Sequence, residues 1–151
     1  MYQQILVPLD GSKLAESVLP YVRCLARALN VPVRLLHVND PETVAGIANP
    51  NRGEDYLRNV QTSVLNSLSV SSSVESGKPA EIIVDMAARD RNTLIAMATH
   101  GRSGIQRWLL GSVGHKVLHA TANPLLLVRP GEQAPSDSAQ LKTLVVPLDG
   151  S

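Results

Sequence analysis

The stretch from Ala98 to Val113 contains residue types that bind anions. Gly101 and Gly104 carry no Cβ atom, so backbone N–H groups beside them can approach a negatively charged group closely. Arg102 and Arg107 add positive charge to the same stretch. It is therefore a candidate phosphate-binding loop, although glycines of this kind also occur in ordinary surface loops.

The end of this stretch is expected to open a helix. Gly111-Ser112 comes directly before residues with helical apolar spacing, and Ser112 is the expected N-cap. The first N–H groups of a helix have no partners within it and lie at the positive end of its dipole. The sequence therefore predicts a phosphate at the start of this helix.

A second candidate residue lies near the start of the chain. Asp10 follows the apolar run 4–9 directly and precedes Gly11. Its carboxylate can accept hydrogen bonds from the hydroxyl groups of a ribose. Taken by itself, Asp10 fits better with a structural role, in which it closes an Asx turn before Gly11. The sequence leaves both roles open.

The elements that must position these residues follow from the apolar pattern. Short apolar runs alternate with segments of helical spacing, and Pro20 lies inside the first helical segment, which it should kink. Residues 70–74 are weakly strand-like and are placed as a strand because the alternation requires one. The expected strands cover 4–9, 32–38, 70–74, 93–98 and 125–128; the expected helices cover 12–29, 57–68, 79–87 and a last one marked by Val113, Val117 and Leu118, with a long loop over 39–53.

This alternation predicts an α/β fold, a doubly wound five-stranded parallel sheet with helices on both faces, as in Rossmann-like domains. Ligands of such sheets bind beyond the carboxyl ends of the strands, where the strand order reverses. With the order 3-2-1-4-5, that point lies between the first and fourth strands. Asp10 and the glycine-containing stretch would then meet in one crevice.

Composition narrows the class of protein. The 151 residues are 44% hydrophobic, enough for one core, and 14 basic against 13 acidic residues give a net charge of +1. Mixed charges and few aromatic residues disfavour partners such as nucleic acid or a membrane surface. The single cysteine, Cys24, excludes an internal disulfide. No secretion or membrane-spanning signal is visible, so a cytoplasmic protein is expected.

Metal binding and catalysis are not expected. His115 and His119 have the i, i+4 spacing of two metal ligands, but Lys116 lies where a zinc peptidase carries glutamate, and no third ligand is evident. The sequence contains no P-loop motif and no general base placed by a motif. We therefore expect a protein that is not an enzyme, with slow ATP hydrolysis left open.

Two motifs together resemble the universal stress protein family. They are Ile-Leu-Val-Pro-Leu-Asp-Gly-Ser at 5–12 and Ala-Thr-His-Gly-Arg-Ser-Gly followed by Leu-Leu-Gly-Ser at 98–112, and the resemblance extends over 3–130. In ATP-binding members the motif runs glycine, two residues, glycine, nine residues, glycine and serine or threonine. This sequence matches it at Gly101, Gly111 and Ser112 but has Ala98 at the first glycine.

The resemblance implies a nucleotide in the crevice between the first and fourth strands and pairing of units through the fifth. It implies that Pro8, Asp10 and Val38 line the adenosine, with Met97 beside them. A methyl group at Ala98 either narrows the pocket or is absorbed by a small shift. The residues implied around the ribose and phosphates are Gly101, Arg102, Gly104, Gly111, Ser112 and Val113.

A repeat lies close to the end of the sequence. Residues 144–151 match residues 5–12 at six of eight positions, with an offset of 149 − 10 = 139 residues. One domain is therefore expected over 1–130, a linker over 131–141, and the first strand of a second copy over 142–151. This organisation predicts a tandem protein.

The function expected from these observations is regulatory binding of an adenine nucleotide in a stress response. ATP is the expected ligand, with AMP or ADP as alternatives, and Mg²⁺ would accompany ATP. The expected protein partner is a second domain of the same kind or a homodimer formed through the fifth strand. The alternative is a nucleotide-free protein-interaction domain, in which Ala98 has narrowed the pocket.

Overall fold

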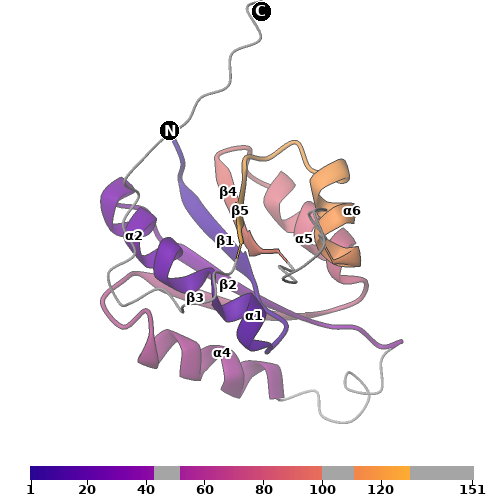
Figure 1. Cartoon of the computed structure of the whole chain (residues 1–151), viewed down its shortest axis with the longest axis horizontal. Helices are drawn as coiled ribbons and strands as arrows, with labels where there is room; N and C mark the ends of the chain where they lie inside the picture. The colour runs from indigo at the N-terminus through magenta and orange to yellow at the C-terminus, as the bar shows by residue number, and fades with distance from the viewer. Residues whose placement is uncertain (43–51, 100–110, 130–151) are drawn as a thin grey trace, which may run out of the picture.

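The computed structural model describes residues 1–42, 52–99 and 111–129, which form a sheet covered by helices on both faces (Figure 1). The strands are β1 (Gln4–Pro8), β2 (Val33–Asn39), β3 (Val70–Ser76), β4 (Thr93–Ala98) and β5 (Leu125–Val128). The helices are α1 (Lys13–Glu16), α2 (Leu19–Leu29), α4 (Arg52–Ser63), α5 (Pro79–Ala88) and α6 (Ser112–Ala120).

The five strands form one parallel sheet in the order β3-β2-β1-β4-β5. The predicted fold class and strand order are confirmed. β2 and then β3 are added on one side of β1, and β4 and then β5 are added on its other side. Because β1 and β4 are paired neighbours, their carboxyl ends lie at the point where the strand order reverses.

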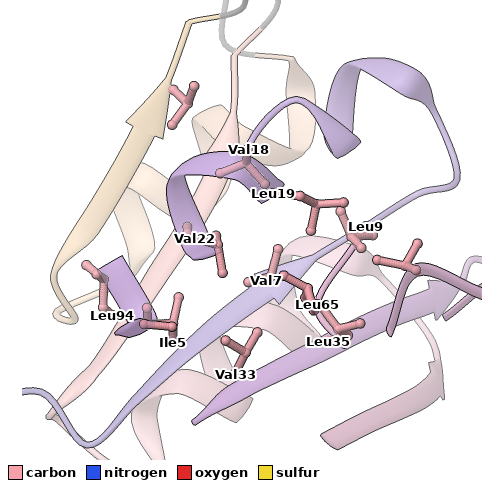
Figure 2. Packing of buried hydrophobic residues seen from close by; sticks show 14 of the residues in the cluster. Ile5, Val7, Leu9, Val18, Leu19, Val22, Val33, Leu35, Leu65 and Leu94 are labelled. Atoms are coloured by element: carbon pink, nitrogen blue, oxygen red, sulfur yellow. The ribbon is translucent and has the colours of Figure 1, made fainter. Parts of the chain in front are cut away.

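Two apolar clusters fill the space between the sheet and its helices. Side chains alternate along β1, so Ile5 and Val7 pack under α2 and α4, whereas Leu6 packs under α5 and α6. This explains why β1 is a continuous apolar run, since both faces of the strand are buried. Figure 2 shows the first cluster from close by, with Val18, Leu19, Val22, Val33 and Leu35 among its members.

The predicted helix over 12–29 is two helices. Ser12 is the N-cap of α1, as expected, and its side chain accepts a hydrogen bond from the Ala15 N–H at 3.1 Å. However, α1 ends at Glu16 and α2 begins at Leu19, with Pro20 in its first turn. A proline is tolerated there because the N–H groups of the first turn have no helical partner. Pro20 therefore lies at a helix start and does not kink a continuous helix.

Three smaller predictions also need correction. The loop expected over 39–53 is shorter, because β2 includes Asn39 and α4 begins at Arg52. The weak strand expected over 70–74 continues to Ser76, where it still pairs with β2. Leu118, expected on the apolar face of the last helix, is 42% exposed. The predicted linker 131–141 and the second copy at 142–151 lie outside the described residues and stay predictions.

Candidate functional site

A cavity of about 280 Å³ lies at the carboxyl ends of β1 and β4. This volume is close to the lower end of the range of about 300–1,000 Å³ for pockets that hold small molecules. The turn after β1, the end of β2, and the start of α1 and α5 form part of its wall. The end of β4 and the start of α6 complete the lining that the described residues provide.

The cavity brings together eight of the predicted site residues, which come from four separate segments of the chain. Three other predicted residues, Gly101, Arg102 and Gly104, lie outside the described residues. The structure therefore places most of the predicted site in one location, while binding by these residues stays a prediction. The eight are Pro8, Asp10, Val38, Met97, Ala98, Gly111, Ser112 and Val113.

Asp10 lies in a tight turn at the mouth of this cavity. Its Oδ1 accepts a hydrogen bond from the Ser12 N–H at 2.8 Å, which is the Asx turn considered in the sequence analysis. Gly11 has a φ of 85°, in the left-handed region that favours glycine. The two roles of Asp10 are compatible, because the turn uses Oδ1 and leaves Oδ2 without a partner among the described residues. The side chain is exposed and lines the cavity.

The N-terminus of α6 forms another part of the cavity wall. Gly111 is its N-cap, with φ −55° and ψ 164°, and no side chain caps the helix. Ser112 is therefore the first helical residue and not the N-cap that the sequence suggested. Because Gly111 has no side chain, the N-cap residue itself offers no side-chain acceptor to the N–H groups of the first turn. Such N–H groups, at the positive end of the helix dipole, favour an anion.

The remaining walls are mostly apolar. Val38 and Met97 pack against the cluster under α5 and α6, whereas Ala98 packs against the cluster on the other face of the sheet. The Ala98 methyl group therefore has apolar neighbours as well as lining the cavity. Several wall residues were missed by the sequence analysis, because apolar residues of this kind give no signal apart from that of a core. They are Leu9, Leu14, Ala15, Leu36, Pro79 and Ile83.

The other candidate site of the sequence is the histidine pair on α6. The rings of His115 and His119 have centroids 4.5 Å apart, and both residues are exposed. Within the described ranges, no group of three or more histidine, cysteine or acidic side chains is arranged to hold a metal ion. None of the helices described is both long and apolar enough to cross a membrane.

Comparison with known proteins identifies the fold and its family. The model of the universal stress protein family matches residues 1–129. The chain belongs to this family. Universal stress protein MJ0531 of Methanocaldococcus jannaschii is 26% identical over 141 residues, which cover 85% of this chain and 83% of that protein.

Solved structures of the family share the fold described above. The structure of MJ0577, also of Methanocaldococcus jannaschii, has a TM-score of 0.72 at 26% identity and covers 88% of this chain and 99% of that chain. A universal stress protein from Archaeoglobus fulgidus, solved in complex with dAMP, has a TM-score of 0.60 at 20% identity. That match covers 83% of this chain and 97% of the other. At this identity the second likeness shows the fold alone.

Proposed function

We propose that the cavity at the carboxyl ends of β1 and β4 binds an adenine nucleotide, with ATP as the first ligand to test. One observation carries the proposal: the N-terminus of α6, whose N-cap Gly111 has no side chain, and the Asp10 turn line the same cavity. The first favours a phosphate, and the second presents a carboxylate to sugar hydroxyls. An apolar wall between them suits a flat base.

Each part of a nucleotide has a place in this arrangement. The adenine lies against Val38 and Met97, and the ribose hydroxyls donate hydrogen bonds to Asp10. The phosphates accept hydrogen bonds from the N–H groups at the start of α6, near Gly111 and Ser112. Gly101, Arg102 and Gly104 complete the phosphate site in this proposal, as the sequence predicts. Mg²⁺ would bind only together with ATP.

A solved structure of the same fold makes an adenine nucleotide the class of ligand to test. The Archaeoglobus fulgidus protein of the same fold was solved in complex with dAMP. A monophosphate needs fewer phosphate contacts than ATP does, so AMP and ADP belong in the same experiment. In our proposal the bound nucleotide regulates the protein, and no rapid reaction follows binding.

The regulatory part of the proposal needs a surface that responds to the nucleotide. β5 is at one edge of the sheet and pairs only with β4 among the described strands. Its sequence, Leu-Leu-Leu-Val, is apolar, and an apolar edge strand is a ready surface for pairing with another chain. We propose that a second copy, or a second domain of the same kind, pairs along this edge.

A nucleotide-free interaction domain is the second candidate, and Ala98 is the observation that favours it. Its methyl group lines the cavity at the position where ATP-binding relatives carry the first glycine of their motif. A Cβ at this point takes space from a ligand that approaches the backbone. In that case β5 would still mediate assembly, without control by a nucleotide.

Calorimetric titration with ATP, AMP and adenosine, on the unmodified chain and on Ala98→Gly, separates the two candidates. Saturable binding by the unmodified chain, with ATP preferred over adenosine, is the expected result. Binding that appears only in Ala98→Gly would identify a cavity closed by one methyl group. Absence of binding in both proteins would reject the nucleotide proposal. GTP is the control for recognition of the base.

A further inference from the structure

His37 lies between two residues that line the cavity, yet it belongs to the other face of the sheet. Leu36 and Val38 line the cavity. Successive side chains of a strand point to opposite faces, and His37 contacts Tyr56 of α4 on the far side. No motif in the sequence includes His37, and it does not line the cavity.

The imidazole of His37 holds the end of β1. Its Nδ1 lies 2.8 Å from the carbonyl oxygen of Leu9. A carbonyl oxygen only accepts, so Nδ1 carries the hydrogen in this contact. The Leu9 N–H donates to the Leu36 carbonyl, also at 2.8 Å. Leu9 is thus bound to β2 through the backbone on one side and through a side chain on the other.

This contact bears directly on the orientation of Asp10. The Leu9 carbonyl and the Asp10 N–H belong to one peptide group, which is planar and rigid. A donor that fixes the direction of the Leu9 carbonyl therefore also fixes the start of the Asp10 turn. Immediately after this peptide the chain leaves the sheet, through Gly11 at a φ of 85°.

The imidazole is itself held in place by α4. The rings of His37 and Tyr56 meet edge to face, with centroids 6.1 Å apart and an interplanar angle of 65°. On another side the imidazole lies against the backbone of Gly53, where an added Cβ atom would be 2.7 Å from Cδ2 of His37. A contact that short would force the ring to move. The absence of a side chain at Gly53 thus makes room for the imidazole.

Tyr56 also reaches toward the Asp10 turn. Burial of its hydroxyl raises the pKa of the phenol above its ordinary value, and the nearby negative charges of Glu16 and Asp10 raise it further. The Gly11 backbone acts in the opposite direction. Because these influences come from the turn and from α1, the Tyr56 hydroxyl lies near the Asp10 turn, while its ring contacts His37.

We propose that His37, held by Tyr56 and Gly53, is a positioning residue that orients the Leu9–Asp10 peptide and so presents Asp10 to the cavity. The role in ligand recognition rests on the proposed nucleotide function; the positioning of the turn does not. His37 does not touch the ligand in this proposal. It acts through Leu9, from the face of the sheet opposite the cavity.

The test compares two substitutions of similar size. His37→Leu removes the donor, whereas His37→Asn keeps an N–H at the same number of bonds from Cα as Nδ1. The backbone amide resonances of Gly11 and Ser12, measured without nucleotide, report the turn directly. We expect them to shift in His37→Leu and to stay close to the unmodified positions in His37→Asn. For ATP we expect about tenfold weaker binding by His37→Leu and recovery of most of it by His37→Asn.

The outcomes separate this proposal from the nucleotide proposal. If the amide resonances shift as expected but the unmodified chain binds no ATP, the positioning is upheld and the nucleotide function is rejected. If a folded His37→Leu protein keeps the Gly11 and Ser12 resonances of the unmodified chain, the positioning is wrong, whatever the chain binds. A loss of affinity in His37→Asn equal to that in His37→Leu would also overturn it.

A second variant tests the same idea if His37→Leu does not fold. Gly53→Ala leaves His37 in the sequence but pushes its ring, and alanine favours the helix that contains this position. The Gly11 and Ser12 resonances should again shift. Glu54→Ala, at an exposed position next to Gly53 on the same helix, is the matched control and should leave them nearly unchanged. A shift in the control equal to that in Gly53→Ala would contradict the role assigned to the ring contact.

Discussion

Replacing Tyr56 by phenylalanine should stabilise the protein. The Tyr56 hydroxyl is buried, and no described residue meets it with full hydrogen-bond geometry, although the Glu16 carboxylate and the Gly11 backbone lie close enough to shift its pKa. A buried polar group without a partner costs about 1–3 kcal/mol. The substitution removes this group and keeps the ring that contacts His37. We therefore expect Tyr56→Phe to raise the free energy of unfolding by about 1 kcal/mol at neutral pH.

The effect of this substitution should grow in alkaline solution. Burial, with the charge of Glu16 as the next cause, raises the pKa of Tyr56 in the folded protein above the ordinary value of 10.0. Above that value the unfolded chain loses the phenolic proton while the folded chain keeps it, so the folded state binds more protons. The stability of the unmodified protein must then fall as the pH rises further. Tyr56→Phe has no phenol to ionise at this position, so this part of the loss of stability is absent from the variant.

Urea unfolding followed by circular dichroism measures both effects, at about pH 8 and about pH 10.5. Tyr21→Phe is the matched control, because the Tyr21 hydroxyl is not one of the buried atoms that lack a partner in the described structure. Tyr21→Phe should not raise the free energy of unfolding at either pH. A Tyr56→Phe protein less stable than the unmodified chain at pH 8 would refute the reasoning, since it would mean that the hydroxyl makes a stabilising hydrogen bond.

Three further predictions concern the candidate site. Asp10→Ala should weaken ATP binding about tenfold while leaving the chain folded, and unchanged affinity in calorimetry would remove Asp10 from the site. Gly111→Val should place a branched side chain at the N-cap of α6 and abolish the preference for ATP over adenosine; a retained preference would contradict the phosphate site. Ser12→Ala removes the α1 cap and should lower the free energy of unfolding by about 1 kcal/mol in urea titration, whereas a loss below a few tenths would show that the cap is dispensable.

The strands were the most predictable part of the fold. β4 and β5 have the predicted bounds, because each appears in the sequence as a short run of mostly apolar residues that ends at a turn. The boundary at Pro20 was less predictable. A proline removes a hydrogen bond inside a helix and none in its first turn, and the sequence does not say which of these positions it occupies.

Some residues of the candidate site could also be predicted from the sequence, and others could not. Asp10 and Gly111 could be found because each follows or precedes a recognisable element and has a distinctive chemistry. The apolar wall residues Leu14 and Ile83 could not, since their pattern is that of any core residue. The contact from His37 to Leu9 joins residues 28 positions apart, and the ring that holds His37 comes from another helix. No local pattern records contacts of this kind.

The most direct test of nucleotide binding is an NMR titration of the isotopically labelled chain with ATP. Nucleotide binding in this cavity predicts saturable shifts in the backbone amides of Asp10, Val38, Met97 and Ser112, which line the cavity from four segments. The amides of β3, at the opposite edge of the sheet from β5, should stay in place. Shifts confined to other surfaces, or no saturable shift at the cavity residues, would contradict the claim that this cavity binds the nucleotide.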